Sequence, residues 1–284
     1  MRLGTYLPFA GPGGVPFDAH EVAVRARRVE AAGFDGVWVG DGSYRRIAPW
    51  PDPLSWLLAV AAGTESLEVG TAIFQVPLRS PVDLAQRFMT LRALTKDRLT
   101  IGVGPGSTAT DYAAYGIPFE NRFSRLYRDL DIIRRLCDAE TVENANLLPW
   151  PSVAGPPRMA LGSWGSRVGI TRAAREFDGW TCSAVHTSID EMRRGIEFYR
   201  ELGGQRAILA TCSIDLTATS QPLPDDEPIN IMCDKAEARR RLEYLAELGF
   251  DDILLVPRQP DRPYFYPADL SLAELVEIRD LIST

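Results

Sequence analysis

Residues 31–39 read AAGFDGVWV, and the same joint returns as ELGFDDILLV at 247–256 and, shortened, as EFDGW at 176–180. Each copy leads from a helical pattern through a Phe–Asp pair into an apolar run as long as a buried strand. Gly33 and Gly249 supply the left-handed conformation that ends a helix. The repeat therefore predicts successive helix-to-strand units whose strands run parallel.

Outward from these joints, short β-rich runs alternate with amphipathic stretches along the whole chain. Eight strands and eight helices in 284 residues indicate an α/β fold of the TIM-barrel type, a (β/α)₈ barrel. The strands are expected at 3–7, 36–40, 67–73, 99–103, 158–161, 179–182, 207–213 and 252–256, and the helices at 20–32, 53–62, 82–94, 123–137, 166–175, 189–202, 234–248 and 272–281.

In such a barrel the repeated joints lie where the strands begin. We expect Phe34, Phe177 and Phe250 to plug the underside of the barrel and the neighbouring aspartates to fix the turns. Residues at this end serve stability in barrel enzymes, so we assign them no chemistry.

We interpret residues 1–284 as one domain, because no low-complexity segment or linker interrupts the alternation. Two irregular stretches, 141–157 and 216–231, contain several prolines. We predict that both are lid loops on the C-terminal side of strands four and seven, where barrel enzymes keep their lids.

Charge and composition exclude several classes of protein. The net charge of −7 disfavours nucleic-acid partners. No apolar run approaches the roughly 18 residues of a membrane helix, and the first residues lack a signal-peptide pattern, so we expect a cytoplasmic protein without membrane partners. The two histidines cannot build a multi-histidine metal site, and Cys137, Cys182, Cys212 and Cys233 form no C-x-x-C pair. We therefore expect no metal.

The segment IGVGPGST at 101–108 directly follows a predicted strand. Its glycines do not match a dinucleotide-binding loop, because the G-x-G-x-x-G spacing fails at Ser107. Gly104 and Gly106 would let a flat or phosphorylated ligand approach the backbone. A plain tight turn is the alternative, and the residues alone leave both open.

The segment MALGSWGS at 159–166 runs from a predicted strand straight into a helix. A helix N-terminus offers free amides and the positive end of a dipole, which suits a phosphate group. The alternative is that Ser166 only caps its helix. The residues predicted to hold the phosphate are Gly162, Ser163, Gly165, Ser166 and Arg167.

In their order, these segments resemble the luciferase-like flavin-dependent oxidoreductases, relatives of bacterial luciferase with a (β/α)₈ barrel. The resemblance covers most of the chain up to about Ser183, and beyond that point only the rhythm of strands and helices matches. The segments that carry it are RRVEAAGFDGVWVGD at 27–41, the run from DPLSWLLAVAAG at 52–63 to DRLTIGVGPG at 97–106, YGIPFENRFSRLYRDLDIIRRL at 115–136, and the GSWGS and DGW block at 162–180.

The resemblance implies a reduced flavin or deazaflavin at the barrel mouth. It also implies a bulge on strand three with a non-prolyl cis peptide that supports the central ring of the cofactor, which in VGTAIF falls at Ala72–Ile73. An ordinary core strand is the alternative. The family places the cofactor phosphate beside strands four and five, in agreement with the separate interpretation of the loop at 162–166.

Two features favour the deazaflavin coenzyme F420 over FMN. FMN-dependent members often carry an arginine where this chain has Pro105, and many have long insertions that this chain lacks. Two departures disfavour the sugar-phosphate dehydrogenase branch. Gly42 replaces a frequent histidine after strand two, and Ser107 replaces an acidic residue after strand four.

The cofactor would carry the hydride step, so the protein must orient the substrate and supply a proton donor or acceptor. The candidates for this catalytic role are His186, Asp41 and Tyr44. His186 could titrate near neutrality, and Asp41 could instead be a structural strut. Phe9, Phe74, Trp50 and Trp164 could line the pocket or fill the core, and Arg258 could meet an anionic group.

Three functions remain open: an F420-dependent oxidoreductase acting on a small organic substrate, an FMN-dependent monooxygenase served by a partner flavin reductase, and a non-catalytic flavin-binding protein. Self-association as a homodimer is expected. The apolar residues of helices 53–62 and 82–94, namely Leu54, Leu57, Leu84 and Phe88, could form the dimer face or pack on the barrel itself.

Overall fold

The structure is a computed structural model, and it describes residues 1–42, 50–148, 150–151, 153–258 and 267–282. Eight parallel strands close into a barrel, because β6 pairs with β7 and β9 pairs with β1. A two-residue strand, β8 (Ile231–Met232), extends the end of β7. The barrel strands are β1 (Arg2–Tyr6), β2 (Gly36–Val39), β3 (Glu68–Gln75), β4 (Leu99–Gly104), β5 (Arg158–Gly162), β6 (Gly179–Ser183), β7 (Ala207–Asp215) and β9 (Asp252–Pro257). The predicted (β/α)₈ barrel is confirmed.

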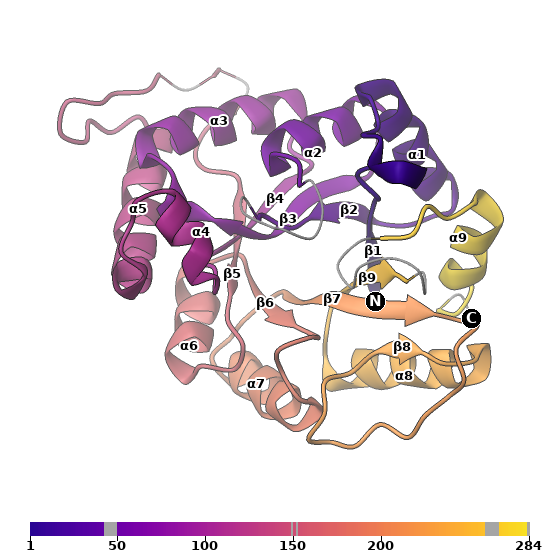
Figure 1. Ribbon diagram of the computed structural model, residues 1–284. Coiled ribbons are helices and arrows are strands. Elements are labelled where there is room, and N and C mark those ends of the chain that lie inside the picture. The colour runs from indigo at the N-terminus through magenta and orange to yellow at the C-terminus, as the bar shows by residue number, and fades with distance from the viewer. Residues whose placement is uncertain (43–49, 149, 152, 259–266, 283–284) are drawn as a thin grey trace.

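Helices surround the strands on the outside of the barrel (Figure 1). The eight predicted helices are α1 (Ala19–Ala31), α2 (Pro53–Ala62), α3 (Pro81–Leu94), α5 (Arg122–Cys137), α6 (Arg167–Glu176), α7 (Ile189–Glu201), α8 (Lys235–Leu248) and α9 (Leu272–Arg279). A short α4 (Ala109–Ala114) was not predicted. Sequence patterns explain several helix starts, since Asp18, Ser188 and Ser271 each form a capping box with a glutamate three residues later.

The aspartates of the three Phe–Asp joints make the same pair of hydrogen bonds to a neighbouring strand. The side chains of Asp35, Asp178 and Asp251 accept hydrogen bonds from the amides of Leu3, Met159 and Ala207, at 2.8, 2.7 and 2.7 Å. The backbone amide of each aspartate donates in return to the carbonyl of the same partner residue. The repeated aspartate therefore fixes the register of one strand against the next, which goes beyond the predicted turn.

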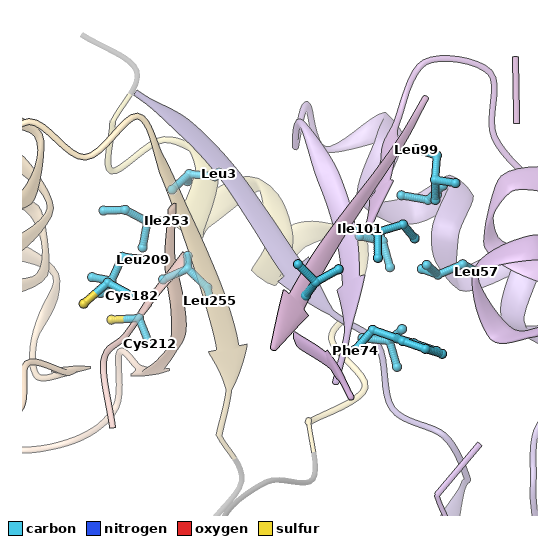
Figure 2. Packing of buried hydrophobic residues seen from close by; sticks show 14 of the residues in the cluster. Leu3, Leu57, Phe74, Leu99, Ile101, Cys182, Leu209, Cys212, Ile253 and Leu255 are labelled. Atoms are coloured by element: carbon cyan, nitrogen blue, oxygen red, sulfur yellow. The ribbon is translucent and has the colours of Figure 1, made fainter. Parts of the chain in front are cut away.

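Apolar side chains fill the layer between the strands and the helices. Figure 2 shows part of this layer, where Leu57 of α2 lies near Phe74, Leu99 and Ile101 of the strands. Leu54, Leu57, Leu84 and Phe88 are buried in this same cluster. Of the two alternatives for these four residues, packing on the barrel is the one observed, and they do not offer a free dimer face.

One tryptophan fills the middle of the barrel. The Trp38 side chain is 2% exposed and belongs to a separate inner cluster. A Cβ atom added at Gly70 would lie 2.4 Å from the Trp38 ring, and one added at Gly4 would lie 2.8 Å from it. An eight-stranded barrel has room only for side chains inside, so the indole depends on glycines in the neighbouring strands.

A cluster of ion pairs fills the underside of the barrel, where the strands begin. Arg206 binds Glu68 at 2.8 and 2.9 Å and Asp252 at 2.7 Å, while Arg2 binds Glu68 at 2.6 Å. Burial by itself would raise the pKa of the Glu68 carboxyl, but the hydrogen bonds and charge of Arg206, with help from Thr100 and Arg2, outweigh it and lower the pKa to about 2.

The predicted aromatic plug is therefore wrong. Phe34 and Phe250 pack in the outer cluster between strands and helices, and Phe177 lies at its edge, partly buried. Their backbones sit at the strand entrances, where side chains alternate between the two faces of a strand. A Phe–Asp pair marks the lower end of the barrel, but it does not show which residues point inside.

The two predicted lid loops lie at opposite ends of the barrel. Residues 141–157 connect the end of α5 to the start of β5, and Arg92 near the end of α3 binds the carbonyls of Ala154, Gly155 and Pro156 at 2.6–2.9 Å. This segment lies at the underside of the barrel, so its prediction as a lid is wrong. The helices α4 and α5 both come between β4 and this segment, which therefore precedes β5 and does not directly follow β4. Residues 216–231 do follow β7 at the C-terminal side.

We predict that Gly70→Ala lowers the free energy of unfolding by about 1–3 kcal/mol, because the new methyl group overpacks the Trp38 ring. Urea unfolding followed by circular dichroism measures the change. Gly40→Ala is the matched control, since its Cβ would lie an ordinary 3.6 Å from Trp50. If the double variant Gly70→Ala/Trp38→Phe shows no recovery of stability, the overpacking explanation is wrong.

We also predict that Glu68 contributes to the free energy of unfolding and that this contribution is lost at acid pH. Its pKa is lowered from 4.5 to about 2 in the folded chain, so its stabilisation is present above about pH 4.5 and is lost as the pH falls toward 2, by about 3 kcal/mol in all. Unfolding free energies of wild type and Glu68→Gln between pH 6 and pH 3 should converge as the pH falls. The exposed Glu247→Gln is the control, and parallel curves for Glu68→Gln would contradict the assignment.

Candidate active site

Two strands carry a bulge, and they face each other across the barrel. Along β3, the two residues between Thr71 and Phe74 lie opposite a single residue of β4. Along β7, the two residues between Leu209 and Cys212 lie opposite a single residue of β9. In the closed order β1-β2-β3-β4-β5-β6-β7-β9, four steps separate β3 from β7 in either direction. A bulge inserts one residue and re-aims side chains, so both strands present extra residues to the interior.

The β3 bulge turns Ala72 and Ile73 into the barrel together. The peptide bond between them is cis, at the position that the resemblance implies. Ala72 packs on the inner cluster, while the Ile73 side chain lies over β4 and β5. A Cβ at Gly104 would lie 3.0 Å from Ile73 Cδ1, and one at Gly162 would lie 2.8 Å from its Cγ2. These two glycines make room for Ile73.

The C-terminal end of the barrel is open. Ala72, Ile73, Gly162, Ser183 and Thr211 all stay partly exposed although they lie on the inner side of the strands. Their partial exposure shows that solvent reaches the inner side of these strands at this end of the barrel. This mouth, defined by these five residues, is the end at which barrel enzymes carry their active sites.

Asp41 is held in a buried ion pair at the rim of the mouth. Both of its carboxylate oxygens accept from Arg79, at 2.6 and 3.1 Å, and one also accepts from the Gln75 amide at 3.0 Å. Hydrogen bonding and charge from Asp41 raise the pKa of Arg79, against the lowering effect of its burial. With both oxygens engaged, the geometry favours the strut over a proton donor for Asp41.

Gly106 serves the same network. The Gln75 side chain donates to the Asp41 carbonyl at 3.1 Å and to Asp111 at 3.0 Å, and its amide oxygen would lie 2.0 Å from a Cβ at Gly106. Gly106 also has a φ of +75°, which disfavours other residues. Close approach by protein groups thus accounts for both Gly104 and Gly106, so a ligand is not needed to explain them.

The loop before α6 keeps a free hydroxyl beside the mouth. Ser166 caps α6 by accepting from the Gly169 amide at 3.4 Å, and the Arg167 guanidinium lies 3.8 Å over the Phe198 ring. The Ser163 side chain rests against the first turn of α6 at Gly169, and its hydroxyl has no hydrogen bond within the described chain. Gly165, with φ +112°, faces open space.

His186 and Trp164 stack over the loops that follow β6 and β5. Their ring centroids are 4.2 Å apart, and Trp164 is 48% exposed. Partial burial lowers the pKa of His186, so its imidazole is neutral at neutral pH. Tyr44, the third predicted proton donor, lies outside the described residues.

Of the other aromatic candidates, Phe74 is buried against Phe88 in the outer core, while the Trp50 indole donates to the Gly40 carbonyl at 2.7 Å beside the end of β2. The sequence analysis did not predict that Tyr6, Ser183 and Thr211 face the mouth. For Tyr6 this direction follows from the alternation of side chains along a strand. For Thr211 it depends on a bulge that no residue pattern announced.

Other features lie away from the mouth. A hollow of about 500 Å³ between α8 and α9 is lined by Lys235, Arg239, Glu277 and Asp280 among others. Across the ranges described, no cluster of three or more potential metal ligands occurs. None of the described helices is long and apolar enough to cross a membrane.

A closed (β/α)₈ barrel with partly exposed inner residues at its C-terminal mouth and a polar helix start beside it is the architecture of a barrel enzyme. A family profile described as luciferase-like monooxygenase matches residues 1–228. The chain belongs to this family.

Individual relatives agree with the family. The F420-dependent glucose-6-phosphate dehydrogenase of Amycolatopsis mediterranei is 30% identical over 206 residues, which cover 66% of this chain and 56% of the relative. The chain thus spans little more than half of that relative's length.

Two solved structures share the whole fold. An F420-dependent secondary alcohol dehydrogenase in complex with an F420–acetone adduct superposes with a TM-score of 0.73 at 17% identity, covering 99% of this chain and 98% of that one. The oxygenating constituent of 3,6-diketocamphane monooxygenase from Pseudomonas putida, in complex with FMN, has the same TM-score at 15% identity, covering 98% and 96%.

We predict that Asp41→Asn costs about 3 kcal/mol of stability, because it leaves the buried Arg79 charge without its partner. Arg79→Gln should cost a similar amount, and the double variant Asp41→Asn/Arg79→Gln should cost less than the sum. Urea unfolding of the four proteins measures this coupling. Additive losses would show that the two side chains act separately, and a stable Asp41→Asn would return Asp41 to the list of proton donors.

Proposed function

We propose that the protein is an oxidoreductase that binds the deazaflavin coenzyme F420 and transfers hydride to or from a small organic substrate. The observation that carries the proposal is the placement of Ile73, which the β3 bulge turns into the mouth over Gly104 and Gly162. There it presents an apolar surface that a flat ring can cover.

The residues at the mouth fit such a cofactor. Ala72 and Ile73 are partly exposed and apolar, as the backing of a ring requires. The Ser163 hydroxyl makes no hydrogen bond in the described part of the chain and Gly165 faces open space, so a phosphate beside α6 would gain a hydrogen bond without displacing one. Gly162, Ser163, Gly165 and Ser166 would hold the phosphate, with Arg167 adding positive charge if it leaves Phe198.

When bound, the deazaflavin supplies the hydride chemistry. The chain itself orients the ring through Ile73, holds the rim rigid through the Asp41–Arg79 pair, and excludes water below the mouth through Trp38. His186 is proposed to exchange the proton at the mouth, since its lowered pKa leaves a neutral imidazole beside the exposed Trp164 face.

F420 is favoured over FMN because two curated relatives at 30% identity carry F420 in their names and because Pro105 stands where FMN enzymes often have an arginine. An FMN-dependent monooxygenase with a partner reductase is the alternative, favoured by the FMN-bound neighbour of equal structural similarity. Oxygen consumption with reduced FMN would distinguish it, since deazaflavins react poorly with oxygen.

We also propose a cytoplasmic homodimer. The four free cysteines suit a reducing compartment. With the inner residues of α2 and α3 used by the barrel, the exposed Leu58, Val82 and Leu94 of these helices offer apolar side chains to a partner copy.

Titration of the purified protein with F420 and with FMN, followed by quenching of tryptophan fluorescence, tests the cofactor. We expect micromolar or tighter binding of F420 and weaker binding of FMN. Ser163→Ala should weaken F420 binding about tenfold, in the range of a hydrogen bond to a charged group, and should leave stability unchanged because this hydroxyl makes no hydrogen bond among the described residues.

Ser80→Ala is the control for this variant, since Ser80 also precedes a helix and makes no capping hydrogen bond. Tighter binding of FMN would favour the FMN-dependent monooxygenase, and binding of neither cofactor would contradict the proposed function.

A further inference from the structure

The β7 bulge puts a strained residue on the wall opposite Ile73. Thr211 has a φ of +59°, a left-handed conformation that is rare for a β-branched residue. Its hydroxyl donates to the carbonyl of Ala210 at 2.7 Å. Glycine would adopt this conformation without cost, so the threonine at this point needs an explanation other than the shape of the strand.

Two further hydroxyls converge on Thr211. Ser183 Oγ, at the end of β6, lies 3.5 Å from Thr211 Oγ1. Tyr6 comes from β1 and is 6% exposed, and its hydroxyl completes no hydrogen bond among the described residues. Burial raises the pKa of Tyr6, and the Thr211 backbone lies near enough to oppose this rise without reaching hydrogen-bond geometry. Leaving a buried hydroxyl unpaired costs about 1–3 kcal/mol.

The three hydroxyls offer both kinds of hydrogen-bonding atom. The Tyr6 proton is free, so Tyr6 can donate. Ser183 accepts from the Val185 amide at 3.3 Å, and its own proton reaches only the Thr211 hydroxyl, at a long 3.5 Å, so Ser183 can donate to a closer acceptor instead. The Thr211 hydroxyl already donates its proton to the Ala210 carbonyl, so toward a ligand it can only accept. Two donors beside one acceptor match a hydroxyl group, and the two donors alone match a carbonyl oxygen.

We propose that Tyr6, Ser183 and Thr211 form a subsite that binds the oxygen atom of a neutral alcohol substrate or of its carbonyl partner, opposite the surface of Ile73. This inference rests on the proposed function, because only that function makes the bound molecule a substrate. The three side chains carry no charge, so they favour a neutral oxygen group over a carboxylate. β3 and β7 lie on opposite sides of the barrel, so Thr211 and Ile73 approach the barrel axis from opposite walls.

The test uses 1,1,1-trifluoro-2-propanol as the probe and follows its fluorine NMR line broadening, with the free protein and with the protein loaded with F420. Tyr6→Phe, Ser183→Ala and Thr211→Gly should each weaken probe binding at least fivefold. Tyr127→Phe, which removes a tyrosine hydroxyl from α5 on the outside of the barrel, should leave it unchanged.

Thermal unfolding of the variants gives a readout that a purely structural role would not produce. Thr211→Gly should raise the melting temperature while weakening the probe, because glycine relieves the left-handed strain. A variant that loses stability and keeps probe affinity would overturn the proposal for that residue. No broadening by the wild-type protein in either form would overturn it altogether.

F420 titration of the same variants separates the two proposals. Their F420 affinity should stay within about twofold of wild type, since the three residues lie on β1, β6 and β7, apart from Ile73 on β3 and from the loop before α6. Loss of F420 affinity together with probe affinity would assign the hydroxyls to the cofactor and overturn the subsite. If wild type binds no F420 but binds the probe through these residues, the proposed function fails and the subsite stands.

Discussion

The space inside an eight-stranded barrel is the constraint on which the rest of this structure depends. Such an interior holds side chains and little else, so every large residue that points inward needs small ones beside it. Trp38 is accommodated by Gly4 and Gly70, and Ile73 by Gly104 and Gly162. The same steric rule therefore builds the closed middle of the barrel and the floor of the proposed cofactor site.

The two ends of the barrel divide stability and function between them. At the underside, Arg206 ties Glu68 and Asp252 into a buried charge cluster, and the repeated aspartates staple one strand to the next. At the mouth, the chain accepts features that cost stability: a left-handed Thr211 and an unpaired Tyr6 hydroxyl. Local departures of this kind are typical of functional sites in otherwise consistent folds.

Much of this could be predicted from the sequence, because periodicity and glycine stops are local signals. The barrel, its eight strands and its eight main helices follow from the Phe–Asp joints and the alternation around them. The cis peptide at Ala72–Ile73 was placed through resemblance to a family, not through any physical reading of VGTAIF. The loop at 141–157 was assigned to the wrong end because the six-residue α4 carries no pattern strong enough to be counted.

The site was harder to predict, since it depends on which side chains face inward and on what already occupies them. Asp41 looks like a free carboxylate in the sequence, but Arg79, almost forty positions along the chain, engages both of its oxygens. Gly106 looks like a ligand contact, but Gln75 fills the space above it. The β7 bulge has no glycine or proline to announce it, so Thr211 could be found only from the register of paired strands.

The central claim is that the cofactor ring lies against Ile73, and contacts between bound F420 and labelled isoleucine methyl groups test it most directly. Nuclear Overhauser effects should be recorded for protein with ¹³C-labelled isoleucine methyls, with the Ile73 signals assigned from Ile73→Val. The account predicts effects from the ring protons of F420 to the Ile73 methyl groups. Bound F420 whose ring protons contact other isoleucines, and not Ile73, would contradict it.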